Sequence, residues 1–179
     1  MVTEAQGWVA ARLESERLVL EPLRVEHADE MVQVLGDPAL YAFTGGEPPS
    51  VDQLQDRYRQ QVAGSGDPAQ RWHNWVVRVR DDGAAVGYVQ ATVTDDGRAA
   101  ELAWLVGAGW QRRGYAGEAA HRMADALVEA GATTLSAQIH PDHAASEAVA
   151  RRIGLQPTAR FDDDGEQLWQ AVTGADRAG

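Results

Sequence analysis

The stretch ELAWLVGAGWQRRGYAGEAAHR, residues 101–122, decides how this chain folds. Its beginning is rich in apolar residues that fit a strand ending at Val106. A turn with glycines follows, and from Gly114 the apolar residues recur at helical spacing. The first N–H groups of a helix have no partner within the helix, and the helix dipole makes that end positive. The stretch therefore predicts a strand, a turn and a helix whose beginning can bind an anion.

The turn before this helix has the composition of a diphosphate site. Two arginines add positive charge, and three small residues would let phosphates approach the backbone closely. The candidate residues are Gln111, Arg112, Arg113, Gly114, Tyr115, Ala116 and Gly117. Taken alone, a surface turn with two solvated arginines has the same pattern and stays an alternative. The chain has no lysine, which excludes a Walker A loop, and no G-x-G-x-x-G follows the first strand.

The elements around this unit predict a mixed α/β fold. Alternating or apolar runs predict strands, and three- and four-residue spacings predict helices. Tight turns at 81–83 and 95–97 join three successive strands into an antiparallel meander. The predicted strands are 17–24, 72–80, 84–94, 99–106, 133–140, 156–161 and 167–172, and the predicted helices are 26–35, 50–63, 114–130 and 143–153. This order does not suit a regular doubly wound sheet.

Length and composition indicate one globular domain. The chain has 179 residues, 44% of them hydrophobic, which is enough to bury a core. We expect a domain at 16–172, a loosely held lead-in at 1–15 and a polar tail at 173–179. The absence of cysteine excludes disulfides, cysteine-ligated metals and a cysteine nucleophile, and the absence of lysine excludes a Schiff base.

The charge balance narrows the classes of partner. A net charge of −11 disfavours binding to nucleic acid or to an anionic membrane. The charge either serves solubility or favours a cationic substrate. Because no apolar run is long enough to span a bilayer and no secretory signal opens the chain, we expect a cytoplasmic protein.

The pattern Gln111-x-x-Gly114-x-Ala116, after a strand that ends in Trp104-Leu105-Val106, resembles the acyl-CoA pyrophosphate loop of the GNAT N-acetyltransferase superfamily. Other segments resemble its RimJ/RimL-like branch, the ribosomal-protein alanine acetyltransferases. These segments are 16–20, 37–38, 100–105, 143–146 and 152–155. Together they make the resemblance specific over about residues 16–172.

The resemblance implies a GNAT fold and acetyl transfer from acetyl-CoA to a primary amine. The sheet would be mostly antiparallel with flanking helices, and the bulged strand ending at Val106 would splay from the strand at 134–140. Backbone at Trp104, Leu105 and Val106 would bind the pantetheine arm, and Gln111 to Gly117 would bind the pyrophosphate. Without a cysteine to carry the acyl group, transfer would be direct, in a ternary complex.

The resemblance also suggests catalytic roles. Glu101 matches the proposed base, acting directly or through a water, and Ser146 matches the residue that protonates the departing thiolate. A solvated carboxylate and a helix-capping serine are the respective alternatives. Many relatives have a tyrosine where this chain has Ala150, and an asparagine where it has His143, whose imidazole could still bind the pantetheine. We expect no metal, because His140 and His143 lack a clear third ligand.

The sequence signals for the residues that would bind the acceptor are less specific than those for the donor. Tyr41 and Phe43 in a loop, and His73 and Trp75 on a strand, are candidate acceptor contacts, although the loop aromatics could equally anchor that loop in the core. The acceptor would be a peptide N-terminus or a cationic small molecule, and the chain a monomer or homodimer. A catalytically silent acyl-CoA sensor is the alternative function. His27 is predicted to be exposed and without a role.

Overall fold

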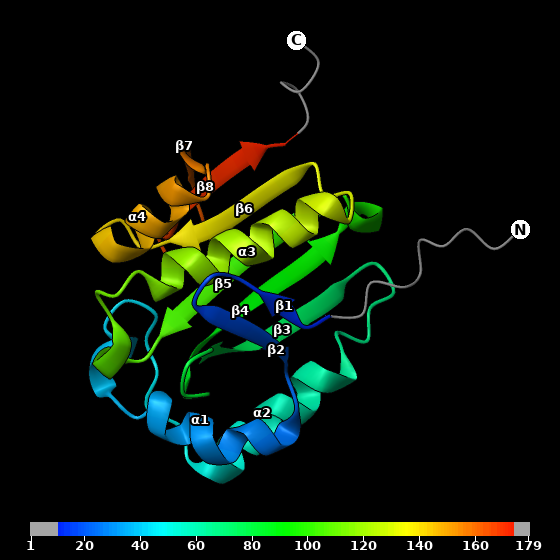
Figure 1. The fold of residues 1–179 in the computed structure, drawn as a ribbon. Helices are drawn as coiled ribbons and strands as arrows, with labels where there is room; N and C mark the ends of the chain where they lie inside the picture. Colours follow the sequence, from blue (N-terminus) through cyan, green and yellow to red (C-terminus); the bar gives the residue numbers. More distant parts are fainter. Residues whose placement is uncertain (1–10, 174–179) are drawn as a thin grey trace, which may run out of the picture.

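The computed structural model describes residues 11–173 and contains one eight-stranded sheet with helices on both faces (Figure 1). The strands lie in the order β1-β2-β3-β4-β5-β6-β8-β7, and β5–β6 is the one parallel pair within these residues. The strands are β1 Leu13–Glu14, β2 Leu18–Pro22, β3 Arg71–Val79, β4 Ala85–Thr94, β5 Ala99–Val106, β6 Thr134–Ile139, β7 Gln156–Phe161 and β8 Gln167–Val172. The main helices are α1 Ala28–Val34, α2 Val51–Ala63, α3 Tyr115–Glu129 and α4 Ala144–Arg152.

The structure confirms the predicted mixed α/β fold with a mostly antiparallel sheet. Each predicted helix and strand is present, with ends that shift by at most two residues. The lead-in predicted at 1–15 is wrong at β1, because Leu13 is buried and pairs with Leu20 of β2. A two-residue strand is too short to show a hydrophobic pattern. The rest of the predicted lead-in and tail, at 1–10 and 174–179, lies outside the described residues.

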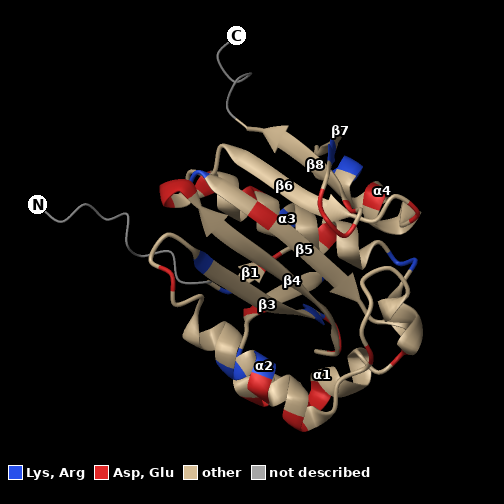
Figure 2. Cartoon of the chain, turned by 180° about the vertical axis from the view of Figure 1, so that it is seen from behind, with Lys and Arg blue, Asp and Glu red and all other residues tan. Residues whose placement is uncertain are grey.

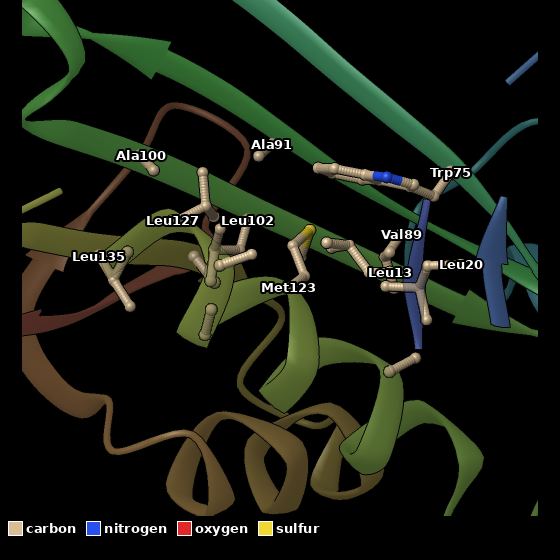
Figure 3. Packing of buried hydrophobic residues seen from close by; sticks show 14 of the residues in the cluster. Leu13, Leu20, Trp75, Val89, Ala91, Ala100, Leu102, Met123, Leu127 and Leu135 are labelled. Atoms are coloured by element: carbon tan, nitrogen blue, oxygen red, sulfur yellow. The ribbon is translucent and has the colours of Figure 1, made fainter. Parts of the chain in front are cut away.

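The sheet separates two hydrophobic clusters. On one face α3 packs against the middle strands, and Trp75 lies flat among aliphatic side chains that include Met123 and Val89 (Figure 3). On the other face α1 and α2 cover β3 and β4 around Met31 and Val76. Since neighbouring residues of a strand point to opposite faces, Trp75 and Val76 belong to different clusters. Figure 2 shows that most charged residues lie on helices and loops.

His27 is buried, contrary to the expectation from its sequence. Its Nδ1 accepts a hydrogen bond from the Arg24 N–H at 3.0 Å, and its Nε2 lies 3.5 Å from Glu21 Oε2. Arg78 of β3 joins this cluster, with its Nε 2.5 Å from Glu21 Oε2 and a second ion pair to Glu30 of α1. Burial lowers the pKa of His27 against the opposing effect of Glu21. The cluster therefore connects α1 to the edge of the sheet through one shared guanidinium.

His73 gives the protein a defined response to acid. The side chain is 4% exposed, and burial, together with the charge of Arg71, lowers the pKa of His73 to about 4. Because the folded pKa lies below the unfolded value, the unfolded chain binds the proton more readily, and stability is lost as pH falls below about 6.5. Between pH 7 and pH 5 the free energy of unfolding should fall by about 2 kcal/mol through this residue.

Urea titrations at both pH values would measure this contribution. His73→Gln should make the unfolding free energy less pH-dependent by about 2 kcal/mol over this interval. His121→Gln, which removes a histidine half-exposed on α3, should leave the wild-type dependence in place. If His73→Gln kept the pH dependence of the wild type, the loss of stability in acid would not come from His73.

Candidate active site

The parallel strands β5 and β6 separate along their length. They pair from Ala99 with Thr134 to Glu101 with Ser136, and the pairing then stops although β5 continues to Val106 and β6 to Ile139. The implied splay is therefore present. Past Glu101, the backbone of β5 faces the gap between the strands instead of a paired neighbour.

The implied bulge is absent from the other side of β5. The β4–β5 register runs without a shift from Gly87 with Val106 to Thr94 with Ala99. Instead, β5 approaches β4 closely at Gly87, where a Cβ would overlap the Leu105 carbonyl oxygen and lie 3.0 Å from Val106 Cα. The glycine is thus required for the position of the β5 end, a role that no local sequence pattern indicates.

Gly87→Ala should destabilise the protein by about 3 kcal/mol, since its methyl group must displace the backbone of β5. Urea denaturation measures the loss. Gly109→Ala is the matched control, because a Cβ at Gly109 has no neighbour within 4 Å. Equal stabilities of the two variants would refute the close approach.

Helix α3 begins at the same end of β5. Gly114 is its N-cap with φ of 79°, in the left-handed region where glycine is favoured, and the first intrahelical bond runs from the Glu118 N–H to the Gly114 carbonyl. The N–H groups of the first turn therefore point out of the helix. Gln111 braces the preceding turn, because its Nε2 donates to the Val106 carbonyl at 3.0 Å. The helix therefore starts where the sequence predicts it, and anion binding at this start stays a prediction.

Two further arginines, not predicted from the sequence, lie at this helix start. Arg17 donates from Nη1 to the Arg113 carbonyl at 2.9 Å, pairs with Glu118 at 2.7 Å and lies over the Tyr115 ring. Arg152 reaches across from α4, so that a Cβ at Gly117 would lie 2.8 Å from its Cδ. Only the fold reveals both, because Arg17, just before β2, and Arg152, at the end of α4, are far from the start of α3 in sequence.

Glu118 fixes this arrangement. Burial favours its protonated form, but hydrogen bonds from the Ser15 hydroxyl and from the backbone and guanidinium of Arg17 lower the pKa of Glu118 overall. The carboxylate therefore stays charged and holds Arg17 beside the helix start. Positive charge is thereby concentrated at one place on an acidic protein.

Glu101 lies where the two strands begin to separate. It pairs with Thr92 on β4 and Ser136 on β6, and its side chain is exposed. Its neighbours Ala100 and Leu102 are buried in the cluster under α3, so Glu101 points to the face that carries α1 and α2. Ala103 shares this orientation one step further into the gap.

The start of α4 forms the opposite wall. His143 is its N-cap and accepts a hydrogen bond at Nδ1 from the Ser146 N–H at 3.4 Å. Burial, with a smaller effect of His140, lowers the pKa of His143, which favours the neutral imidazole that such an acceptor needs. Ser146 lies in the first turn of α4 and is half-buried. Ala150, one turn later, is fully buried in the core.

The two aromatic residues of the loop before α2 differ in their contacts. The Tyr41 hydroxyl donates to the Leu35 carbonyl at 3.0 Å, as expected of an anchor. Phe43 is 38% exposed and stacks on the His143 ring, with centroids 4.4 Å apart. Phe43 therefore connects the acceptor-side loop to α4 across the end of the sheet.

His73 and Trp75 point to the face of the sheet opposite Glu101, although Trp75 also lines a cavity and His73 a groove beside α2, so their contact with an acceptor stays a prediction. Both side chains are buried, and Trp75 belongs to the cluster under α3, with its Nε1 donating to the Ala11 carbonyl at 2.8 Å. They point to that opposite face because they occupy the other positions of the strand alternation. The intervening Asn74, and not these two residues, shares the face of Glu101.

The described residues fit an acyl-CoA in two respects. The outward N–H groups of α3 and the surrounding arginines suit a diphosphate, and Gly114 adds no Cβ at the helix start. The separated part of β5 offers backbone partners to an extended amide chain. Within residues 11–173, no group of three or more His, Asp or Glu could hold a metal ion. None of the helices in that range has the length and apolar character to cross a membrane.

Solved structures of the same fold were found by structural comparison. An acetyltransferase from Agrobacterium tumefaciens str. C58 has 24% identity and a TM-score of 0.73, over 93% of this chain and 96% of that one. RimL, a ribosomal L7/L12 alpha-N-protein acetyltransferase in complex with coenzyme A, has 13% identity and a TM-score of 0.77, over 93% and 100% of the two chains. The microcin C7 self-immunity acetyltransferase MccE, in complex with acetyl-CoA and AMP, has 12% identity and a TM-score of 0.73, over 88% and 93%.

These identities are low, so the structural similarities show the fold. RimL is among the similar folds, in agreement with the branch that the sequence resembles. A search of curated proteins found no match. The family model of the acetyltransferase (GNAT) domain, however, matches residues 17–156, which is most of the chain. The chain therefore belongs to the GNAT family of acetyltransferases.

Proposed function

We propose that the protein transfers an acetyl group from acetyl-CoA directly to a primary amine, in a ternary complex. The observation that carries this proposal is the gap between β5 and β6, which begins beside Glu101 and leads to the first turn of α3. A donor could enter from the α3 side and an acceptor from the face of α1 and α2. The two would then meet at the gap without a covalent enzyme intermediate.

The donor would be held mainly by backbone. The pantetheine arm would pair with the separated part of β5 at Trp104, Leu105 and Val106, and its diphosphate would lie on the N–H groups that follow Gly114. Arg112 and Arg113, together with Arg17 and Arg152 nearby, would balance its charge. The close packing of Arg152 on Gly117 supports this placement.

Glu101 would prepare the acceptor. An ammonium group must lose a proton before its nitrogen can attack, and a carboxylate can remove that proton directly or through a water. The exposure of Glu101 on the acceptor face, at the start of the gap, supports this role. Its alternation with Leu102 directs the side chain away from the core.

Ser146 would act on the departing thiolate. It lies in the first turn of α4, on the wall opposite β5, and its hydroxyl can donate a proton or a hydrogen bond. His143 would position this turn, since its imidazole accepts from the Ser146 N–H. With alanine at position 150, the chain offers no hydroxyl one turn further along α4.

A panel of amines tests the proposed function. The protein with acetyl-CoA is offered peptides with different N-termini, polyamines and aminoglycosides, and release of the CoA thiol is followed by absorbance. We expect release with at least one acceptor, together with a mass increase of that acceptor by one acetyl group. Donor binding without thiol release from any amine would instead support the acyl-CoA sensor.

A further inference from the structure

A small cavity lies between α2 and the sheet, on the face to which Glu101 points. It has a volume of about 130 Å³. Its walls come from α2, β3 and β4 and from the ends of β2 and α1. The lining residues are Leu23, Leu35, Arg57, Tyr58, Gln61, Asn74, Trp75, Tyr88 and Gln90.

Two buried polar atoms of the lining lack hydrogen-bond partners among the described residues. They are the hydroxyl of Tyr58, whose residue is 4% exposed, and Oε1 of Gln61, one turn of α2 away. A buried polar group without a partner costs about 1 to 3 kcal/mol, which a folded protein rarely accepts without a reason. Burial also raises the pKa of Tyr58, so the hydroxyl keeps its proton and can donate it. Both atoms therefore indicate that the cavity receives a polar group.

The charge of the lining selects among polar groups. Arg57 is the one charged residue of the lining, and no carboxylate accompanies it. The positive charge of Arg57 acts on the phenols of Tyr58 and Tyr88 and opposes the rise in pKa that burial causes in both. A guanidinium, a phenol hydroxyl and several amides suit an oxygen acceptor, whereas a second ammonium group would meet repulsion.

The register of the strands places the cavity beside the gap. Gln90 and Tyr88 of its lining pair with Ala103 and Leu105, which lie on the separated part of β5. Neighbouring strands are about 5 Å apart, so the cavity is roughly one strand spacing from that backbone. An acceptor whose amine is at the gap could therefore reach the cavity with a group a few bonds away.

A wider groove continues outward from the cavity. It has a volume of about 680 Å³ and shares Leu23, Gln61 and Asn74 with the cavity. Trp72 and Val62, both partly exposed, lie along it. The rest of a longer acceptor would have room there, in contact with apolar side chains.

We infer that the cavity recognises a carbonyl or carboxylate oxygen of the acceptor, so that the substrate is an amine of peptide type rather than a polyamine. This inference rests on the proposed function. Tyr58 and Arg57 would donate hydrogen bonds to that oxygen, and Gln61 would accept one from an adjoining N–H. Tyr58 is thus a specificity-determining residue of the acceptor site.

Tyr58→Phe provides the test. The acceptors are the dipeptide Ala-Ala, its C-terminal amide and 1,5-diaminopentane, each with saturating acetyl-CoA. The wild type should prefer both dipeptides to the diamine by at least about tenfold in kcat/KM, and Tyr58→Phe should raise KM for both dipeptides about tenfold, as one lost hydrogen bond predicts. The KM for acetyl-CoA and the rate with the diamine should not change. Because the lost hydroxyl is unpaired in the fold, the melting temperature should not fall.

Arg57→Gln distinguishes the two sources of the oxygen. A larger loss with Ala-Ala than with its amide would assign the cavity to a carboxylate, and equal losses would assign it to a peptide carbonyl. The matched controls are Arg59→Gln and Gln60→Ala, which change exposed neighbours on α2. They should leave the KM for Ala-Ala and the KM for its amide unchanged.

The outcomes separate this inference from the proposed function. If the wild type acetylates amines but prefers the diamine, or if Tyr58→Phe leaves both dipeptide KM values unchanged, the inference is wrong. A lower melting temperature with equal losses for all three acceptors would also refute it, by giving the hydroxyl a structural role. If no amine releases CoA from the wild type, the proposed function itself fails.

Discussion

Replacing Glu101 by glutamine is expected to lower kcat for acetyl transfer about 10³-fold, with little change in acetyl-CoA affinity. The amide keeps the shape of the side chain but cannot remove a proton from the acceptor. General base catalysis accelerates a reaction by about 10²- to 10⁴-fold. The side chain is exposed at the start of the gap, away from the helix start that would bind the donor. Steady-state kinetics with the best amine of the panel measure kcat. Calorimetric titration with acetyl-CoA measures the donor affinity.

Glu166→Gln is the informative comparison for this variant. Glu166 precedes β8, and burial, with contributions from nearby Asp162, Asp164 and Glu101, raises its pKa. It is therefore a second carboxylate close to the site. If Glu166→Gln lowers kcat about 10³-fold and Glu101→Gln does not, Glu101 is not the base. Glu129→Gln, at the far end of α3, should behave as the wild type.

Replacing Gly114 by valine is expected to weaken acetyl-CoA binding at least about 100-fold. The φ of 79° is strained for a β-branched residue, and the added Cβ would lie 3.3 Å from Arg17 Nη2 and 3.8 Å from Arg152 Nη1. The side chain would occupy the approach to the first turn of α3, and each charge-assisted hydrogen bond lost there costs about 1.5 to 3 kcal/mol. Calorimetric titration with acetyl-CoA measures the loss.

Gly83→Val separates lost binding from backbone strain. Gly83 has φ of 72°, and a Cβ there has no neighbour within 4 Å, in the turn between β3 and β4. The two variants should lose similar stability, but only Gly114→Val should lose the donor. Undiminished acetyl-CoA affinity in Gly114→Val would mean that the diphosphate lies elsewhere.

Local patterns were sufficient to predict the order of the elements. The meander of β3 to β5 followed from two tight turns, and α3 from a long periodic stripe. The burial within this stripe is not uniform, since Val128 is exposed whereas Ala126 is buried. Periodicity assigns a face only to within about one residue, because the neighbouring element decides which edge of the stripe is covered.

The position of the candidate site in the fold could be predicted where its residues are contiguous in sequence. The turn from Gln111 to Gly117 lies at the start of α3 as expected. Contributions from distant segments could not be predicted: Arg17, just before β2, and Arg152 of α4 reach the same helix start. The need for glycine at position 87 is likewise visible only in its contact with the backbone of β5. The direction of the His73 and Trp75 side chains could not be predicted, because a strand alternates and its sequence alone does not show which of its faces meets α3.

The parallel pairing of β5 and β6 has an electrostatic consequence. Because the two strands run in the same direction, the helices that follow them, α3 and α4, both begin beyond the same edge of the sheet (Figure 1). Two positive dipole ends and several guanidinium groups thus converge on one corner of a molecule whose overall charge repels anions. We therefore expect a polyphosphate diffusing toward the protein to be steered to that corner, with a capture rate that declines steeply with added salt.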